Sequence, residues 1–326
     1  MAPTFSRLVD AALDRTVAPG YTRLGLAVRR RLGDWPDDPT AGSLTGQVAL
    51  VTGATSGLGE ATAVGLARLG AGLRLVVRDV EKGEQVAEDI RREVPGVDVV
   101  VHRCDVADLD DVRRLAAELL ADPTLSHLDV LVHNAGAMPP ERTESPQGHE
   151  LTMALHVLGP VLMTEQLLPL LGDGPGGPSR VVLVTSGGMY AQRLRDDDPE
   201  YRSGEYSPTT AYARSKRAQV ELLPCLDERW RGHGVEVHAM HPGWADTPGV
   251  VDSLPLFHKV TGPLLRDAEE GADTTVWLAA ARPAPEPGRL WQDRRPRPVH
   301  LLRRTRPAEG GVARMWGWAQ EQTGLA

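Results

Sequence analysis

Cysteine, phenylalanine and long apolar runs are scarce in this sequence. The 326 residues include only two cysteines and two phenylalanines, and aromatic residues make up 4% of the chain. Cys104 and Cys225 match no disulfide or metal-binding pattern, so we expect no bound metal and a reducing, cytoplasmic environment. No apolar stretch is long enough for a membrane span or a signal peptide. The formal net charge of −8 argues against nonspecific nucleic-acid binding.

A glycine-rich loop joins a short apolar strand to a helix. The strand is predicted at Gln47–Val51 and the helix at Glu60–Leu69. Glycines between them let the backbone turn tightly and approach a pyrophosphate that rests on the helix N-terminus. The alternative is a turn that only packs the helix on the strand. The predicted cofactor-binding residues here are Gly53, Ser56, Gly57, Leu58 and Gly59.

The next predicted strand, Leu73–Val77, ends at a cation, Arg78. An NAD enzyme usually places an acid there, whereas a guanidinium pairs with the 2′-phosphate of NADP. We therefore predict NADP as the cofactor and regard NAD as less favoured, although Asp79 follows directly. One charge-assisted contact gives about a 10- to 150-fold preference. Because Ser56 adds no second cation, we expect the lower half of that range.

Strands and helices alternate along the chain. This order predicts an α/β fold, a single Rossmann-type doubly wound domain whose mostly parallel sheet is flanked by helices and binds ligands beyond its carboxyl edge. We expect an N-terminal helical extension over 1–44, the catalytic domain over 45–302 and a C-terminal tail over 303–326. Further strands are predicted at Val97–His102, Asp129–Val132 and Val181–Val184, and further helices at Glu81–Val94, Leu109–Leu120 and Gly148–Leu171.

Tyr212 and Lys216 lie four residues apart in a helical stretch, which places a phenol and an ammonium on one helix face. A nearby cation favours the phenolate and lowers a tyrosine pKa from its usual value of about 10. Such a tyrosine can act as an acid and a base. Tyr-x-x-x-Lys alone is a common pattern, so the assignment depends on the other motifs.

The motifs together resemble the short-chain dehydrogenase/reductase family, over about Thr45 to Leu302. The resemblance adds the expectation of seven strands. His241–Val250 and Thr185–Met189 are in addition similar to the subgroup called dehydrogenase/reductase SDR family member 12. The family motifs are, in order, Thr52-Gly-x-x-x-Gly-x-Gly59, Asn134-Ala-Gly136, Ser186, Tyr212-x-x-x-Lys216 and Pro242-Gly243.

The resemblance implies a role for each matched residue. Tyr212 is expected to be the general acid/base, Lys216 to bind the nicotinamide ribose and lower the tyrosine pKa, and Ser186 to orient the substrate oxygen. The protein would orient the cofactor and manage the proton. Further cofactor contacts are implied for Asp105 and Val106 at the adenine, for Asn134, Ala135 and Gly136 at the adenosine ribose, and for Pro242, Gly243 and Thr247 at the nicotinamide carboxamide.

His156 is a departure from the family pattern, which usually has an asparagine there that holds a water linking the lysine to solvent. A histidine has an unperturbed pKa near 6.5, so a relay through it would be pH-sensitive. A core histidine with satisfied partners is the open alternative. His133, where the family often has another asparagine, is expected to be structural.

These features predict an NADP-dependent oxidoreductase that interconverts a carbonyl and an alcohol on a small-to-medium, apolar substrate. Met189, Tyr190 and Trp244 suggest an apolar pocket, bordered by the loop 193–209 and by an apolar lid segment at 250–257. The alternative is an NADP-binding sensor or scaffold with little turnover. A nucleotide-sugar epimerase fits less well, because its glycine spacing differs.

Apolar residues recur at helical spacing in residues 5–32, with arginines among them. A basic amphipathic helix can lie on a membrane surface, which would make the protein peripheral. The alternative is packing on the domain, or on a partner subunit in a homo-oligomer.

Overall fold

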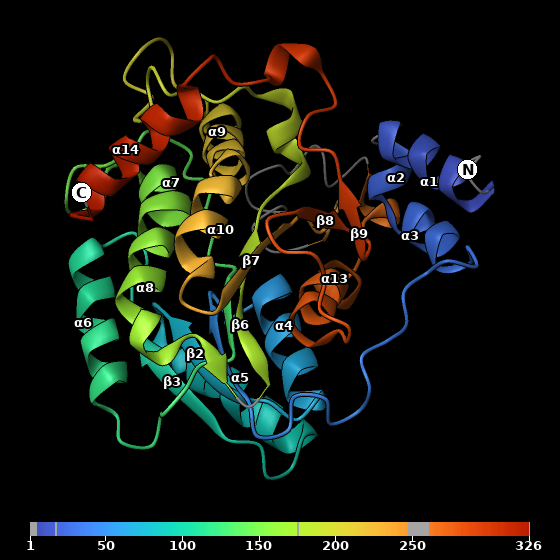
Figure 1. Ribbon diagram of the computed structural model, residues 1–326, viewed down its shortest axis with the longest axis vertical. Helices are drawn as coiled ribbons and strands as arrows, with labels where there is room; N and C mark the ends of the chain where they lie inside the picture. Colours follow the sequence, from blue (N-terminus) through green and yellow to red (C-terminus); the bar gives the residue numbers. More distant parts are fainter. Residues whose placement is uncertain (1–4, 17, 175, 247–260, 326) are drawn as a thin grey trace.

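The computed structural model describes residues 5–16, 18–174, 176–246 and 261–325. Its centre is a twisted sheet with the strand order β3-β2-β1-β4-β6-β7-β8-β9 (Figure 1). Within the described residues, seven strands form a continuous parallel array, which confirms the predicted fold. The seven are β1 (Val48–Thr52), β2 (Gly72–Val77), β3 (Val99–Arg103), β4 (Val130–His133), β6 (Gly177–Val184), β7 (Val235–Met240) and β8 (Leu290–Gln292).

Two short antiparallel strands extend the predicted sheet. β9 (Arg295–Arg297) pairs with β8 at one edge, and β5 (Asp173–Gly174) pairs with the start of β6. The strand order reverses between β1 and β4, so their carboxyl ends open the crevice in which such sheets bind ligands. The glycine loop after β1 and Ser186 after β6 lie on this edge.

Helices cover both faces of the sheet, and each layer has its own apolar core. On one face, α4 packs against α13 and α5, and on the other α6 packs against α8 (Figure 1). Both layers are buried because the parallel strands between them carry apolar side chains on both faces. The bounds are α4 (Gly57–Arg68), α5 (Val80–Glu93), α6 (Leu109–Ala121), α8 (Gly159–Leu167), α9 (Pro208–Glu221), α10 (Leu223–Arg231) and α13 (Ala268–Ala280).

The long helix predicted over Gly148–Leu171 is irregular. It begins at Leu151, because Gly148 has a positive φ of 81° and the Glu150 carboxylate caps the amide of Met153. Four helical segments of three types follow one another: α7 (Leu151–Met153), a π-helical turn (Ala154–Leu158), α8 and a 3₁₀ turn (Leu168–Leu170). Contrary to the expectation from the sequence, residues 151–170 are apolar and long enough to cross a membrane, but 78% of the most apolar 18 residues are buried within the protein, as in a core helix.

The N-terminal helices α1 (Phe5–Arg15), α2 (Ala18–Tyr21) and α3 (Arg23–Arg30) pack beside β8, β9 and α13 (Figure 1). A buried ion network joins them to the sheet. Arg29 donates to Asp10 at 2.7 Å and to Asp293 at 2.6 Å. Arg266 also donates to Asp293, at 2.6 and 3.0 Å, and Arg297 donates to Asp10. The inner face of these helices is therefore fixed to the domain.

The C-terminal segment ends in α14 (Gly311–Thr323), which lies in the predicted tail. Its Met315 and Ala319 are buried in the core on the α6 and α8 side. The Trp318 ring packs edge-on against His149, with ring centroids 6.4 Å apart. This tail therefore contributes to the packed structure.

Candidate active site

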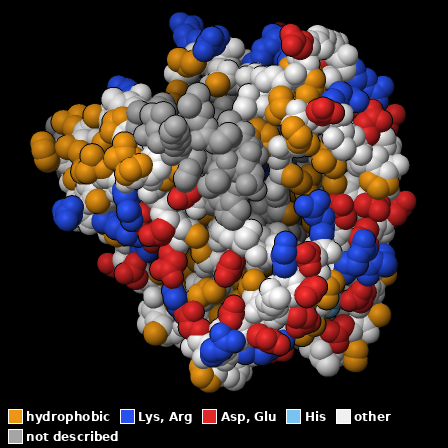
Figure 2. All heavy atoms as spheres, turned by 180° about the vertical axis from the view of Figure 1, so that it is seen from behind, with side chains coloured by type: hydrophobic (Ala, Val, Ile, Leu, Met, Phe, Trp, Pro, Cys, Tyr) orange, Lys and Arg blue, Asp and Glu red, His pale blue; other side chains and the backbone are white. Residues whose placement is uncertain are grey.

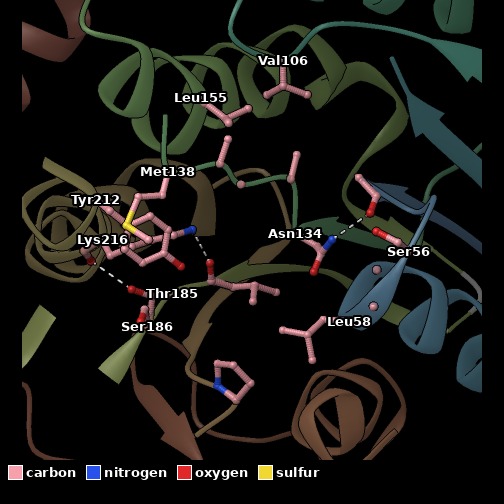
Figure 3. A pocket seen from close by; sticks show the side chains of 18 of the residues that line it. Ser56, Leu58, Val106, Asn134, Met138, Leu155, Thr185, Ser186, Tyr212 and Lys216 are labelled. Carbon is pink, nitrogen blue, oxygen red and sulfur yellow. Dashed lines mark hydrogen bonds between the residues drawn. The ribbon is translucent and has the colours of Figure 1, made fainter. Parts of the chain in front are cut away.

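A cavity of about 870 Å³ opens at the carboxyl edge of the sheet (Figure 3). Thr247 and the segment 250–257 fall outside the described residues. No group of three or more His, Cys, Asp and Glu side chains in the described ranges could hold a metal ion. The predicted residues that line the cavity are Gly53, Ser56, Gly57, Leu58, Gly59, Arg78, Asp105, Val106, Asn134, Ala135, Gly136, Ser186, Tyr212, Lys216, Pro242 and Gly243.

The glycine loop is held in place by the end of β4. Gly53 has a φ of 67°, and a Cβ on Gly59 would lie 2.1 Å from the Gly53 carbonyl oxygen, so neither position accommodates a side chain. The Asn134 side-chain amide donates to the carbonyls of Thr52 and Gly53 at 3.0 and 3.2 Å. Thr52 Oγ1 in turn accepts from two backbone amides after β4. Asn134 therefore fixes the loop in addition to lining the cavity.

The N-terminus of α4 faces this cavity. The first amides of a helix have no partner within the helix, and the Ser56 side chain forms no capping hydrogen bond to them. Gly57, Leu58 and Gly59 line the cavity. Unpartnered amides at a helix N-terminus, approached by glycine backbone, suit a phosphate group. This end of the cavity therefore fits the pyrophosphate of a dinucleotide.

The end of β2 supplies two cations to the same cavity. Arg78 is exposed and lines it, and Lys82, in the first turn of α5, lines it as well. The Asp79 carboxylate accepts from the Lys82 amide at 3.1 Å as the cap of α5, and lies 3.5 Å from the Lys82 ammonium. Asp79 is thus bound to its own helix. Lys82 was missed from the sequence; its position three residues after a helix-capping aspartate was the available signal.

Tyr212, Lys216 and Ser186 meet on the opposite side of the cavity from Ser56 and Asn134 (Figure 3). The Lys216 ammonium donates to the Val184 carbonyl at 2.7 Å, and lies 5.7 Å from the centre of the Tyr212 ring. Ser186 Oγ accepts from the Gly188 amide at 3.2 Å, which fixes its position at the end of β6. The three side chains predicted to act together are therefore adjacent.

The predicted direction of the Tyr212 pKa shift is wrong in this structure. Burial raises the pKa of Tyr212, and a hydrogen bond with Ser186 only partly opposes the shift. Lys216 does not offset the burial, because its ammonium points to the Val184 carbonyl and burial lowers its own pKa to about 7. Near neutral pH the phenol is protonated, which is the form that can donate a proton.

His156 lies in the π-helical turn behind Tyr212, with the two rings edge to face and their centroids 5.3 Å apart. Its Nε2 accepts from the Ala137 amide at 3.3 Å, so Nδ1 carries the hydrogen and donates to Ser215 Oγ at 2.8 Å. Ser215 donates to the Tyr212 carbonyl at 2.9 Å. Burial, together with the charge of Lys216, lowers the pKa of His156 well below 6.5. It is a neutral, satisfied histidine.

We expect His156→Asn to retain much of the activity, since an amide can accept from Ala137 and donate to Ser215. His156→Ala should slow turnover, because it leaves the Ala137 amide without its acceptor and removes the donor to Ser215. The wild-type pH–rate profile should show no inflection from this group near pH 6.5, since the imidazole stays neutral there. An inflection near 6.5 that is absent in His156→Asn would show instead that the histidine titrates during turnover.

Apolar side chains form part of the cavity wall. Met138, Leu155 and Trp244 line it, as predicted for Trp244. Met189 and Tyr190 do not: Met189 is buried in the core, and the Tyr190 hydroxyl donates to the Pro298 carbonyl at 2.7 Å. Of the loop 193–209, Thr209 alone is a lining residue, and it already belongs to α9.

The end of α2 supports the Pro242–Ala245 wall of the cavity. The Trp244 amide donates to the Tyr21 carbonyl at 2.8 Å, and Arg266 donates to the Pro242 carbonyl at 2.9 Å. A Cβ on Gly243, whose φ is 77°, would lie 2.7 Å from the Tyr21 carbonyl oxygen. No local sequence pattern predicts this contact, because it joins residues more than 200 positions apart.

Comparison with known proteins identifies related sequences and structures. The family model described as short chain dehydrogenase matches residues 47–196. A bovine (Bos taurus) protein named dehydrogenase/reductase SDR family member 12 is 38% identical, with 89% of this chain and 90% of that protein covered. Human retinol dehydrogenase 13 is 35% identical, with coverages of 74% and 75%.

Solved structures give a consistent result. An uncharacterised protein from Mycobacterium paratuberculosis has a TM-score of 0.68 and 29% identity, with 88% of this chain and 98% of that chain covered. The Pseudomonas aeruginosa RhlG/NADP active-site complex has a TM-score of 0.63 and 26% identity, with coverages of 78% and 96%.

Proposed function

Because this chain belongs to the short-chain dehydrogenase/reductase family, it is an NAD(P)-dependent oxidoreductase acting on alcohol and carbonyl groups, and we propose that NADP is its cofactor and Tyr212 its acid/base. The proposal for Tyr212 is carried by one observation: its ring shares the cavity wall with Ser186 and Lys216. The alternative, an NADP-binding sensor or scaffold with little turnover, rests on His156 alone, because Ser186, Tyr212 and Lys216 are all present in the cavity wall.

The proposed chemistry assigns one task to each side chain. The nicotinamide, when bound, supplies or accepts the hydride. In reduction the Tyr212 hydroxyl donates its proton to the oxygen of the forming alcohol, and in oxidation its phenolate accepts that proton. Ser186 holds the same substrate oxygen by a hydrogen bond. Lys216 would bind the nicotinamide ribose and return Tyr212 to its starting protonation state.

The proposed preference for NADP rests on Arg78 and Lys82. Both line the pocket beyond β2. Among the described residues, Arg78 has no carboxylate partner, and the carboxylate beside Lys82 is that of Asp79. Two cations suit a phosphate dianion, whereas the hydroxyl of NAD gives them nothing to neutralise. Because Lys82 adds a second cation, we expect the preference for NADP over NAD to lie in the upper half of the roughly 10- to 150-fold range estimated for one guanidinium, or above it.

Arg78→Ala should weaken NADPH binding by about tenfold or more and leave NADH binding nearly unchanged, because a charge-assisted hydrogen bond is lost only with the phosphate. Lys82→Ala should act in the same direction, and the double variant should lose most of the preference. Calorimetric titration with both cofactors measures this, and the preference should shrink as salt rises. Equal affinities of the wild type for the two cofactors would contradict the assignment.

The substrate is proposed to be small to medium and apolar, given Met138 beside Tyr212 and the further apolar lining residues Leu155 and Trp244 (Figure 3). Burying one further methylene stabilises a complex by about 0.8 kcal/mol, or roughly fourfold. In a series of straight-chain aldehydes, kcat/KM with NADPH should therefore rise by about this factor per carbon until the pocket is filled. A preference for short, polar aldehydes would count against an apolar substrate.

A further inference from the structure

The most exposed large apolar side chains of the described residues lie in the N-terminal helices. Phe5 is 79% exposed, Leu24 59% and Leu8 56%, more than any other such residue. Figure 2 shows hydrophobic side chains gathered at the end of the molecule that these helices form, with Lys and Arg side chains at the margin. Such a cluster on an otherwise polar surface marks an interaction site.

On these helices the acidic side chains are buried, whereas several arginines are exposed. Asp10 and Asp14, the only acids between residues 5 and 33, are both buried against the arginines of the ion network. Arg7, Arg15 and Arg31 are exposed and form no ion pair with any described residue. Arg23 and Arg30 are also exposed, and are paired with acids of α13 at 3.4–3.7 Å. The outer face therefore presents apolar and cationic groups, although the whole chain carries −8.

We propose that this outer face, made of Phe5, Leu8, Arg15, Leu24 and Arg31, docks on a lipid bilayer that carries anionic headgroups. Apolar side chains would enter the boundary between headgroups and acyl chains, and the arginines would meet the lipid phosphates and carboxylates. A second copy of the chain is a poorer occupant, because a symmetric pair brings the unpaired arginines of both copies into one interface and supplies no acid of this face to oppose them.

Docking at this face would bring the cavity close to the bilayer. The end of α2 holds the Pro242–Ala245 wall through the Tyr21 carbonyl and the Trp244 amide. The same short helices thus carry the outer face and support the wall of the cavity. An apolar substrate could pass from lipid to the cavity over a short path; this consequence, unlike the docking itself, rests on the proposed function.

The test is co-sedimentation of the full chain, loaded with NADPH, with phosphatidylcholine vesicles that contain or lack phosphatidylserine. We expect binding that requires phosphatidylserine and weakens with salt. Each arginine near an anionic surface contributes about fivefold, so Arg15→Gln with Arg31→Gln should weaken binding by tenfold or more. Phe5→Ser with Leu8→Ser should also reduce it strongly. Both double variants should keep the wild-type melting temperature and activity on a water-soluble carbonyl.

Matched controls are available on the rest of the surface. Val100 in β3 and Leu120 in α6 are exposed apolar residues away from the N-terminal helices, so Val100→Ser with Leu120→Ser should leave vesicle binding unchanged. Failure of the wild type to sediment with anionic vesicles would overturn the proposal. So would a wild-type dimer in solution that the Phe5 and Leu8 substitutions dissociate without any vesicle binding. Because sedimentation needs no turnover, it separates failure of docking from failure of the enzymatic proposal.

Discussion

Tyr212→Phe is expected to lose turnover by a factor of roughly 10² or more, with NADPH affinity almost unchanged. The substitution keeps the ring that packs against His156 and removes only the hydroxyl at the cavity. Lys216 donates to the Val184 carbonyl and is proposed to bind the nicotinamide ribose, so the hydroxyls of Ser186 and Tyr212 are the groups left to contact the substrate oxygen. Steady-state kinetics with a reactive aldehyde, together with a cofactor titration, measure both quantities.

Tyr190→Phe is the matched control for this variant. Tyr190 is a buried tyrosine in the same region, but its hydroxyl donates to the Pro298 carbonyl and its side chain does not line the cavity. The control should lose little activity per folded molecule. Comparable turnover in Tyr212→Phe and the wild type, on every carbonyl tested, would remove Tyr212 from the mechanism.

Asp293→Asn should lower the free energy of unfolding by about 3–5 kcal/mol, the cost of leaving a buried charge without its partner. Asp293 is the shared acceptor for Arg29 and Arg266, and all three side chains are at most 2% exposed. Asparagine tolerates the positive φ of 53° at this position, so the change tests charge and not backbone strain. Urea unfolding followed by circular dichroism would measure it.

The dependence of this difference on pH gives a second check. Although burial by itself would raise the pKa of Asp293, Arg266 and Arg29 hold it at about 2, below the ordinary 3.8. The carboxylate therefore stabilises the fold fully above about pH 4 and loses this effect as pH falls towards 2.

Glu93→Gln, which breaks an exposed pair with Arg68, should lower the free energy of unfolding by no more than about 1 kcal/mol. A cost this small for Asp293→Asn would mean that the network does not hold the N-terminal helices.

The sequence predicted the sheet and the residues around the cavity because their signals are local. A buried strand that runs into a glycine turn, or a tyrosine four residues before a lysine, specifies its own geometry within one element. The π-helical turn at Ala154–Leu158 has no such signal, because it depends on packing against α9. The antiparallel β9 and two-residue β5 are too short to produce a periodic pattern.

Contacts between distant segments account for the rest. The support of Trp244 by Tyr21 and the presence of Lys82 in the cavity depend on how the helices pack on the sheet. The expected pKa of Tyr212 was wrong for a related reason: helical spacing fixes which face a lysine occupies, but not that its ammonium is held by the Val184 carbonyl, nor how deeply the phenol is buried. Burial and hydrogen-bond direction are properties of the complete fold.

The most direct test of the central claim is transfer of a labelled hydride. Wild-type protein is incubated with NADPH deuterated at the reactive ring carbon and with an apolar aldehyde or ketone, and the alcohol formed is analysed by mass spectrometry. We predict one deuterium on the carbinol carbon of the product, formed at least about 10² times more slowly by Tyr212→Phe. Tight NADPH binding by the wild type without deuterium in any alcohol, across a broad panel of carbonyl compounds, would contradict the assignment of this cavity as a carbonyl-reducing active site.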